Sequence, residues 1–83
     1  MRVRVSGPQE LIYLGVADSV RLRSAQGEIQ ILWGHAPYMA EIGTGGLEIR
    51  EGGEVLAGKT SGGIVYNNKN EVSIILFEPY EFG

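Results

Sequence analysis

The segment with the clearest chemical pattern is residues 53–60, which read Gly-Glu-Val-Leu-Ala-Gly-Lys-Thr and fit the phosphate-loop pattern G-x-x-x-x-G-K-[ST]. In such a loop, backbone N–H groups at the start of a helix surround the phosphates, while the lysine reaches their outer oxygens. The pattern therefore requires a strand before it and a helix after it. Here only eleven residues separate Thr60 from the next apolar run at Val72, and two of them are glycines. No crossover helix fits into that length, so we expect neither a phosphate site nor ATP binding.

The alternative interpretation of the same segment is a β-hairpin. Residues 51–54 (EGGE) would form its turn, because glycine supplies the positive φ angles of tight hairpins. Val55 and Ala57 would then pack inward on the return strand. We adopt this interpretation because it needs no helix after the lysine.

His35 is the only histidine of a chain that has no cysteine. These counts exclude the common structural zinc sites, and no serine stands in a nucleophile-elbow pattern that would use His35 as a base. His35 lies in the turn Gly34-His35-Ala36-Pro37, where Pro37 biases Ala36 toward an extended conformation. We expect His35 to shape this loop or to contact a partner, and we assign no catalytic, cofactor-binding or metal-binding residue.

Trp33 lies between a predicted strand and this turn. Large aromatic side chains bury much area and are enriched at interfaces. Trp33 can therefore cover one end of the domain or contact a partner, and the residue types alone leave both roles open. The chemistry-bearing residues together indicate a binding or scaffold domain without an active site.

The composition describes one small domain spanning residues 1–83. A chain of this length has room for a single modest core. The formal net charge is −3 and the basic residues are scattered among acids, which disfavours nucleic acid and anionic membrane surfaces as partners. The sequence holds no apolar run of about 18 residues that would form a membrane-spanning helix.

The elements that must position these residues follow a period of two, which indicates half-buried strands. Apolar residues alternate with polar ones at Val3 and Val5, from Val16 to Leu22, at Ile29 and Ile31, and at Leu47 and Ile49. The run at 72–77 is continuously apolar, as if it were covered on both sides or lay at a sheet edge against a partner. Turn signals stand at 7–8, 27, 34–37, 43–46, 52–53, 61–63 and 67–70. Short strands with frequent turns predict a small antiparallel β-sandwich or barrel with no helix.

The order of these landmarks resembles the N-terminal domain of ATP synthase epsilon subunits over essentially the whole chain. The matching features are the strand at 3–6 with Pro8, Tyr13 and Gly15; the turn Gly34-His35-Ala36-Pro37; Gly46 before Leu47 and Ile49; the glycines of 61–63; and the strand with Val72, Ile74 and Leu76. The resemblance implies an all-β fold, a small flattened antiparallel β-sandwich of about ten short strands.

The resemblance also implies the function of a non-catalytic central-stalk subunit in a proton- or sodium-translocating F-type ATP synthase. Such a rotor subunit needs no cofactor and couples the gamma subunit to the c-subunit ring. It would lie at the cytoplasmic face of the cell membrane and meet the membrane only through the complex. Carried over by position, the expected contacts are Glu28, Trp33, His35 and Pro37 on the ring side, and Pro8, Met39, Ala40 and Glu41 on the gamma side.

The sequence also departs from the family pattern. Trp33 stands where a proline is common, Tyr38 where a leucine is usual, and the segment 67–70 is more polar than in most members. Family members usually continue into a C-terminal pair of helices that can inhibit ATP hydrolysis. This sequence ends at Gly83, so we expect either a naturally short form or a chain from which the helices were removed, and no inhibition by an extended helix. The alternative function is a free-standing β-sandwich binding module with an aromatic site around Trp33 and Tyr38.

Overall fold

The computed structural model describes residues 1–34, 36–78 and 81–82, and within these residues every regular element is a β-strand. The nine strands are β1 (Arg2–Ser6), β2 (Leu11–Val16), β3 (Ser19–Ser24), β4 (Gly27–Leu32), β5 (Tyr38–Glu51), β6 (Glu54–Thr60), β7 (Gly63–Asn68), β8 (Glu71–Leu76) and β9 (Glu81–Phe82). The described part contains no helix with the length and apolar character needed to cross a membrane. The prediction of an all-β domain is confirmed.

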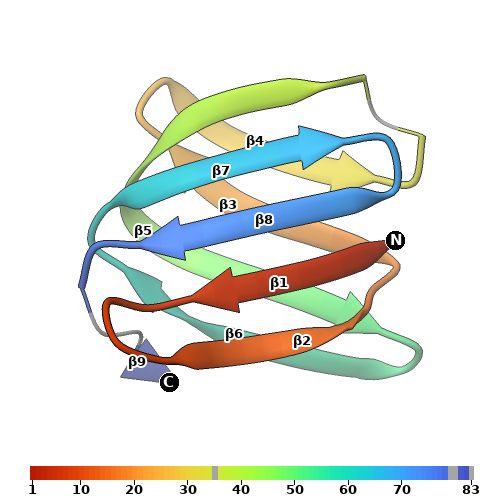
Figure 1. The fold of residues 1–83 in the computed structure, drawn as a ribbon, viewed down its shortest axis with the longest axis horizontal. Helices are drawn as coiled ribbons and strands as arrows, with labels where there is room; N and C mark the ends of the chain where they lie inside the picture. Colours follow the sequence, from red (N-terminus) through yellow and green to blue (C-terminus); the bar gives the residue numbers. More distant parts are fainter. Residues whose placement is uncertain (35, 79–80, 83) are drawn as a thin grey trace.

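The strands form one sheet that curls into two layers, with neighbours in the order β2-β1-β8-β7-β5-β3-β4 and with β6 paired to β5. In Figure 1, β7, β8, β1 and β2 lie in the nearer layer, and β4, β3 and β6 lie behind them. We call these the front layer and the back layer. The sandwich prediction is confirmed, although the described residues contain nine strands where about ten were expected.

One ladder departs from the predicted antiparallel arrangement. Strands β1 and β8 pair in parallel, with Val3 beside Val72 and Val5 beside Ile74. Parallel neighbours need a long connection, and here almost the whole chain lies between the two strands. The four paired valine and isoleucine side chains are buried, so this ladder joins the two ends of the described chain through the core.

The predicted turn at 43–46 was wrong, because these residues lie inside the fourteen-residue strand β5. The first part of β5 pairs with β7, and the second part pairs with β3 and β6. Strands that change layers bend at a bulge or at glycines. The Thr60 hydroxyl fixes this bend by donating to the carbonyl oxygens of Gly43 and Gly45, at 3.2 and 3.4 Å. The glycines therefore bend a continuous strand and do not end it.

The core consists of the apolar side chains that point between the two layers. Its buried members are Met1, Val3, Val5, Ala17, Val20, Leu22, Ile31, Ile42, Leu47, Ile49, Val65, Val72, Ile74 and Leu76. They come from both layers and include the residues predicted to alternate at Val3, Val5, Ile31, Leu47 and Ile49, while Ile29 is partly buried against them. Period-two alternation therefore identified the inward faces of β1, β4 and the second part of β5 correctly.

The hairpin interpretation of residues 51–60 is confirmed for its turn and wrong for its inward face. Gly52 has a φ of 63°, as a tight turn requires. Residues 54–60, which fit most of the phosphate-loop pattern, form strand β6. The register pairs Leu56 with Ile49, which is buried, so Leu56 faces the core and Val55 and Ala57 point outward. Both faces of this strand carry apolar residues, so alternation alone did not determine which face is buried.

The stretch from Val16 to Leu22 was predicted as one strand, and the structure divides it. Strand β2 ends at Val16, which is exposed, and β3 begins at Ser19. Between them, the Asp18 N–H donates to the Arg50 carbonyl at 2.7 Å, and its carboxylate accepts from the Gly52 N–H at 3.0 Å. Asp18, the polar exception in the pattern, thus anchors the crossing from the front layer to the back layer.

The turn between β7 and β8 allows a stability prediction. Lys69 adopts a φ of 55°, the left-handed region in which a residue with a Cβ is strained. We expect Lys69→Gly to raise the free energy of unfolding by about 0.5–1 kcal/mol, because the strain removed exceeds the added freedom of the unfolded chain. Urea denaturation measures this change. The control Asn68→Gly, at a neighbour without a positive φ, should lower stability, and equal effects of the two glycines would contradict the explanation.

Tyr13 allows a prediction on pH dependence. Burial, the hydrogen bond to the Glu51 carboxylate and that carboxylate's charge raise the pKa of Tyr13 from 10.0 to about 12. The protonated phenol therefore contributes stability below pH 10 that is lost as the pH rises toward 12. We expect the wild-type chain to lose stability between pH 10 and 12 more steeply than Tyr13→Phe. In ultraviolet absorbance, the wild-type-minus-variant difference should titrate near pH 12 when folded and near pH 10 in denaturant.

Candidate interaction surfaces

The outer face of the front layer carries large apolar side chains in contact with solvent. Met39 is 65% exposed, Ile75 51% and Tyr66 42%, and Ile64 and Leu14 accompany them. These five residues come from β5, β7, β8 and β2, and we call them the apolar outer face. Soluble single domains rarely leave several large apolar side chains uncovered on neighbouring strands. This face therefore has the character of an interaction surface.

The strand register arranges this face in rows. In one row, Met39 lies opposite Tyr66, and Tyr66 lies opposite Ser73. In the next row, Ile64 lies between Glu41 on β5 and Ile75 on β8. The row continues from Ile75 to Ser6 on β1, two residues before Pro8. Directly opposed side chains lie within contact distance of each other, so these residues form a strip across three strands in the first row and across four in the second.

The four residues expected on the gamma side have different positions relative to this face. Met39 and Glu41 are exposed and belong to its rows, and Pro8 is exposed in the turn beyond its far end. Ala40 points the other way and packs against the core. The Glu41 carbonyl also accepts a hydrogen bond at 2.9 Å from Ala25 in the β3–β4 hairpin. The structure thus brings Met39 and Glu41 together, with Pro8 at the opposite border.

Sequence reasoning did not single out Leu14, Ile64, Tyr66 or Ile75. The available signal was the continuous apolar run at 72–77, which was predicted to be covered on both sides or to lie at a sheet edge. Strand β8 lies between β1 and β7, so the edge position was wrong, and its outer face is uncovered within the described chain. The sequence signal for this surface was therefore Ile75, an apolar residue that faces solvent although β8 is an interior strand.

The residues expected on the ring side lie along β4, the last strand of the sheet order. Glu28 stands near the start of this strand, and Trp33 and Pro37 stand in the turn after its end. The five steps from Glu28 to Trp33 correspond to about 17 Å along a strand. Trp33 is 75% exposed, so its side chain lies on the surface and does not cover a buried end of the domain. His35 lies outside the described residues.

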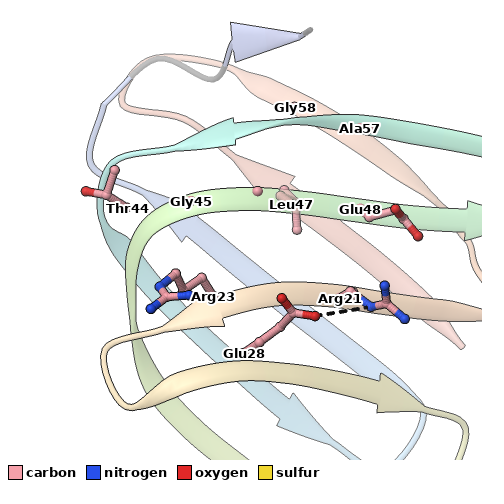
Figure 2. Close-up of a pocket in the computed structure, with 10 residues that line it drawn as sticks. Arg21, Arg23, Glu28, Thr44, Gly45, Leu47, Glu48, Ala57 and Gly58 are labelled. Carbon is pink, nitrogen blue, oxygen red and sulfur yellow. Dashed lines mark ion pairs between the residues drawn. The ribbon is translucent and has the colours of Figure 1, made fainter.

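The outer face of the back layer combines charged residues with the exposed Val55 of β6. Figure 2 shows Arg21, Arg23, Glu28 and Glu48 around a shallow hollow whose floor includes Gly45 and Gly58. The Arg21 Nε lies 3.6 Å from a carboxylate oxygen of Glu28, and both side chains are about half exposed. Exposed ion pairs of this kind contribute about 0–1 kcal/mol each. Paired charges of both signs do not form a strong local field, so this hollow has no feature of a catalytic centre.

A metal centre has no support either. Among the residues that the structure describes, no three histidine, aspartate or glutamate side chains gather closely enough to hold a metal ion. The raised pKa of Tyr13 arises from burial and from the hydrogen bond to the Glu51 carboxylate, so it does not indicate a metal site. The candidate site of the protein is therefore a pair of contact surfaces, the apolar outer face and the β4 edge.

Comparison with known proteins gives a consistent match. The family model described as the beta-sandwich domain of the ATP synthase delta/epsilon chain matches residues 1–78. The ATP synthase epsilon chain of Leptospira interrogans is 36% identical over 75 residues, which cover 90% of this chain and 59% of the relative. The ATP synthase epsilon chain of a Cyanothece species is 36% identical over 76 residues, which cover 92% of this chain and 55% of the relative. The chain thus spans little more than half the length of these relatives.

Solved structures agree on the fold. A chain of the Euglena gracilis mitochondrial ATP synthase, in a structure of OSCP, F1 and c-ring, superposes with a TM-score of 0.85 at 26% identity over 92% of this chain and 49% of the other. A chain of the Tetrahymena thermophila central stalk and c-ring superposes with a TM-score of 0.80 at 20% identity. The second match covers 94% of this chain and 63% of the other and supports the fold alone.

Two neighbouring isoleucines on β8 provide a direct test of which face is uncovered. Ile74 is 1% exposed and Ile75 is 51% exposed. We expect Ile74→Ala to lower the free energy of unfolding by about 2–5 kcal/mol, because it leaves a cavity in the core. Ile75→Ala should change it by less than about 1 kcal/mol. Chemical denaturation of the isolated chain measures both, and a large loss at Ile75 would mean that this side chain already has an intramolecular cover.

Proposed function

Because the chain belongs to the ATP synthase delta/epsilon β-sandwich family, we propose that it serves as the β-sandwich part of a non-catalytic rotor subunit in the central stalk of an F-type ATP synthase. In this role it couples the gamma subunit to the c-subunit ring of a proton- or sodium-translocating enzyme. The observation that carries the proposal is the apolar outer face of the front layer, a surface with no catalytic group that is suited to a permanent partner.

The gamma subunit packs on the apolar outer face. Complete burial of a large apolar side chain contributes about 1.5–3 kcal/mol, so covering these partly exposed residues supplies a share of the free energy that offsets the cost of association. Met39 and Glu41 lie at one border of the face and Pro8 at the other, which gives three of the four residues expected on the gamma side a place in the same contact. Ala40 contributes indirectly, because it packs the strand that carries Met39 against the core.

The c-subunit ring contacts the edge formed by β4 and the turn that follows it. Glu28 and Trp33 lie at opposite ends of this strand, so a contact that includes both must extend along its length. A ring of identical polar loops has that extent, and Glu28, Trp33 and Pro37 are all exposed toward such a partner. His35 belongs to the same turn in the sequence and completes the expected ring side.

The subunit is held at the membrane through the complex only. Its own surface offers paired charges on the back layer, and its net charge of −3 repels anionic lipid. The position that follows from the proposed assembly is peripheral, at the cytoplasmic face of the cell membrane. The proposed role requires no cofactor.

Co-purification with the gamma subunit from the same genome tests the proposal. We expect a one-to-one complex on size-exclusion chromatography. Ile75→Glu should weaken the complex at least 100-fold, because it places a carboxylate in a dry apolar contact. Val55→Glu is the matched control, since Val55 is 47% exposed on β6 of the back layer and should leave binding within about twofold of wild type.

Each contrary result has a distinct meaning. If gamma binding is retained in Ile75→Glu but lost in Val55→Glu, the gamma contact lies on the back layer. A failure to bind gamma at any ionic strength would contradict the rotor function and favour the free-standing binding module. That alternative predicts a small ligand or peptide that quenches the fluorescence of Trp33, the single tryptophan.

A further inference from the structure

Asn67 is a completely buried amide on the inner face of β7, with 0% of its surface exposed. The register places it between Tyr38 at the start of β5 and Val72 on β8. Its side-chain Nδ2 donates a 2.9 Å hydrogen bond to the carbonyl oxygen of Ala36, which lies 31 residues away in the chain. This bond connects the inside of the front layer to the turn between β4 and β5.

An asparagine at this position is not explained by packing alone. The other inward residues of the neighbouring ladders are mostly valine, isoleucine and leucine, and an apolar side chain of similar volume would fill the same space. A buried amide is tolerated because it is hydrogen-bonded, and such a bond specifies geometry more than it adds stability. The partner of the amide is therefore the best guide to the role of Asn67.

The position of that partner is informative. Ala36 comes two residues before β5 begins, in the turn that also holds Trp33 and Pro37. The β5–β7 ladder fixes the chain from Tyr38 onward, and the amide of Asn67 fixes it two residues earlier, at Ala36. The side chain thus extends the attachment of β7 beyond the end of its ladder and into the turn.

Strand β7 contributes to the apolar outer face on one side and contacts the β4–β5 turn from its other side. Tyr66 and Ile64 point outward and belong to the apolar outer face, while Asn67 points inward and holds the turn. We propose that Asn67 is a positioning residue that locks the β4–β5 turn to β7, so that the turn and the apolar outer face move as one rigid unit. Naming the ring and gamma as the partners of these two surfaces rests on the proposed function, whereas the lock itself does not.

The rest of the polar segment 67–70 does not share this role. Asn68 is exposed, and Lys69 and Asn70 form the tight turn between β7 and β8. The polar segment 67–70 therefore comprises one buried residue with a long-range contact and three surface residues. Asn68 consequently provides a matched control for Asn67.

The isolated chain tests the lock without any partner. In Asn67→Leu, we expect amide hydrogen exchange at Trp33, Gly34 and Ala36 to accelerate at least tenfold, while exchange in the centre of β7 stays within twofold of wild type. The fluorescence anisotropy of Trp33, the single tryptophan, should decay faster because the turn gains local motion. Asn68→Leu should leave both measurements unchanged. A turn as slow to exchange in Asn67→Leu as in wild type would overturn the proposal.

A measurement on the unaltered protein covers the case in which Asn67→Leu does not fold. A through-hydrogen-bond scalar coupling between the Asn67 side-chain nitrogen and the Ala36 carbonyl carbon is expected by NMR. Detection supports the lock, and its absence in a spectrum that resolves comparable backbone couplings overturns it. This result is independent of gamma and of the ring.

The assembly tests the consequence of the lock. We expect Asn67→Leu to bind gamma within twofold of wild type, because the apolar outer face is intact, while the gamma complex binds detergent-solubilised c-ring at least fivefold more weakly. Unchanged ring binding together with a loosened turn would overturn the rigid-unit inference. Loss of gamma binding in the wild-type chain would instead contradict the proposed function and leave the NMR result standing.

Discussion

Strand β5 is the element on which the other features depend, because it belongs to both layers of the sandwich. Its first part pairs with β7 in the front layer, and its second part pairs with β3 and β6 in the back layer. The bend at 43–46 allows Ile42 and Leu47 to be buried in the same core on either side of it. If the bend were a true turn, the two layers would be joined only by loops. Continuity of one strand therefore sets the relative position of the two faces.

Much of the fold could be predicted from local patterns, and the failures share one physical cause. Alternation identified the inward residues of β1 and β4 because the positions between them, Arg2, Arg4, Glu28 and Gln30, are polar. It failed at Val55, where both faces are apolar and burial is decided by pairing Leu56 with Ile49 across the sheet. It failed again at the glycines of 43–46, since glycine permits a turn or a bend equally well and a distant residue, Thr60, selects the bend. Local sequence does not encode such distant partners explicitly.

The interaction surfaces were predictable to a smaller extent. Met39 and Glu41 were expected from the family pattern, and the structure places both on one exposed face. The centre of that face, Ile64 and Ile75, was missed because solvent-side residues of interior strands look like core residues until the strand order is known. Glu28 and Trp33 were expected on one side of the domain without any distance between them. Strand β4 lies between these residues and makes that side an extended edge.

The two surfaces use different physics, and this difference suits a coupling element. The apolar outer face is suited to holding a partner by burial of surface, which is non-directional and tolerates small shifts of side chains. A directed hydrogen bond from Asn67 reaches the β4–β5 turn at Ala36, and its geometry is lost when the donor is removed. Between them lies a ladder of paired strands with a close-packed core, which resists shear because no strand can slide without breaking register. A domain built in this way can transmit a mechanical load from one partner to another without catalysing a reaction. The paired strands make the domain stiff, and the hydrogen bond from Asn67 fixes the orientation of the β4–β5 turn relative to the sheet.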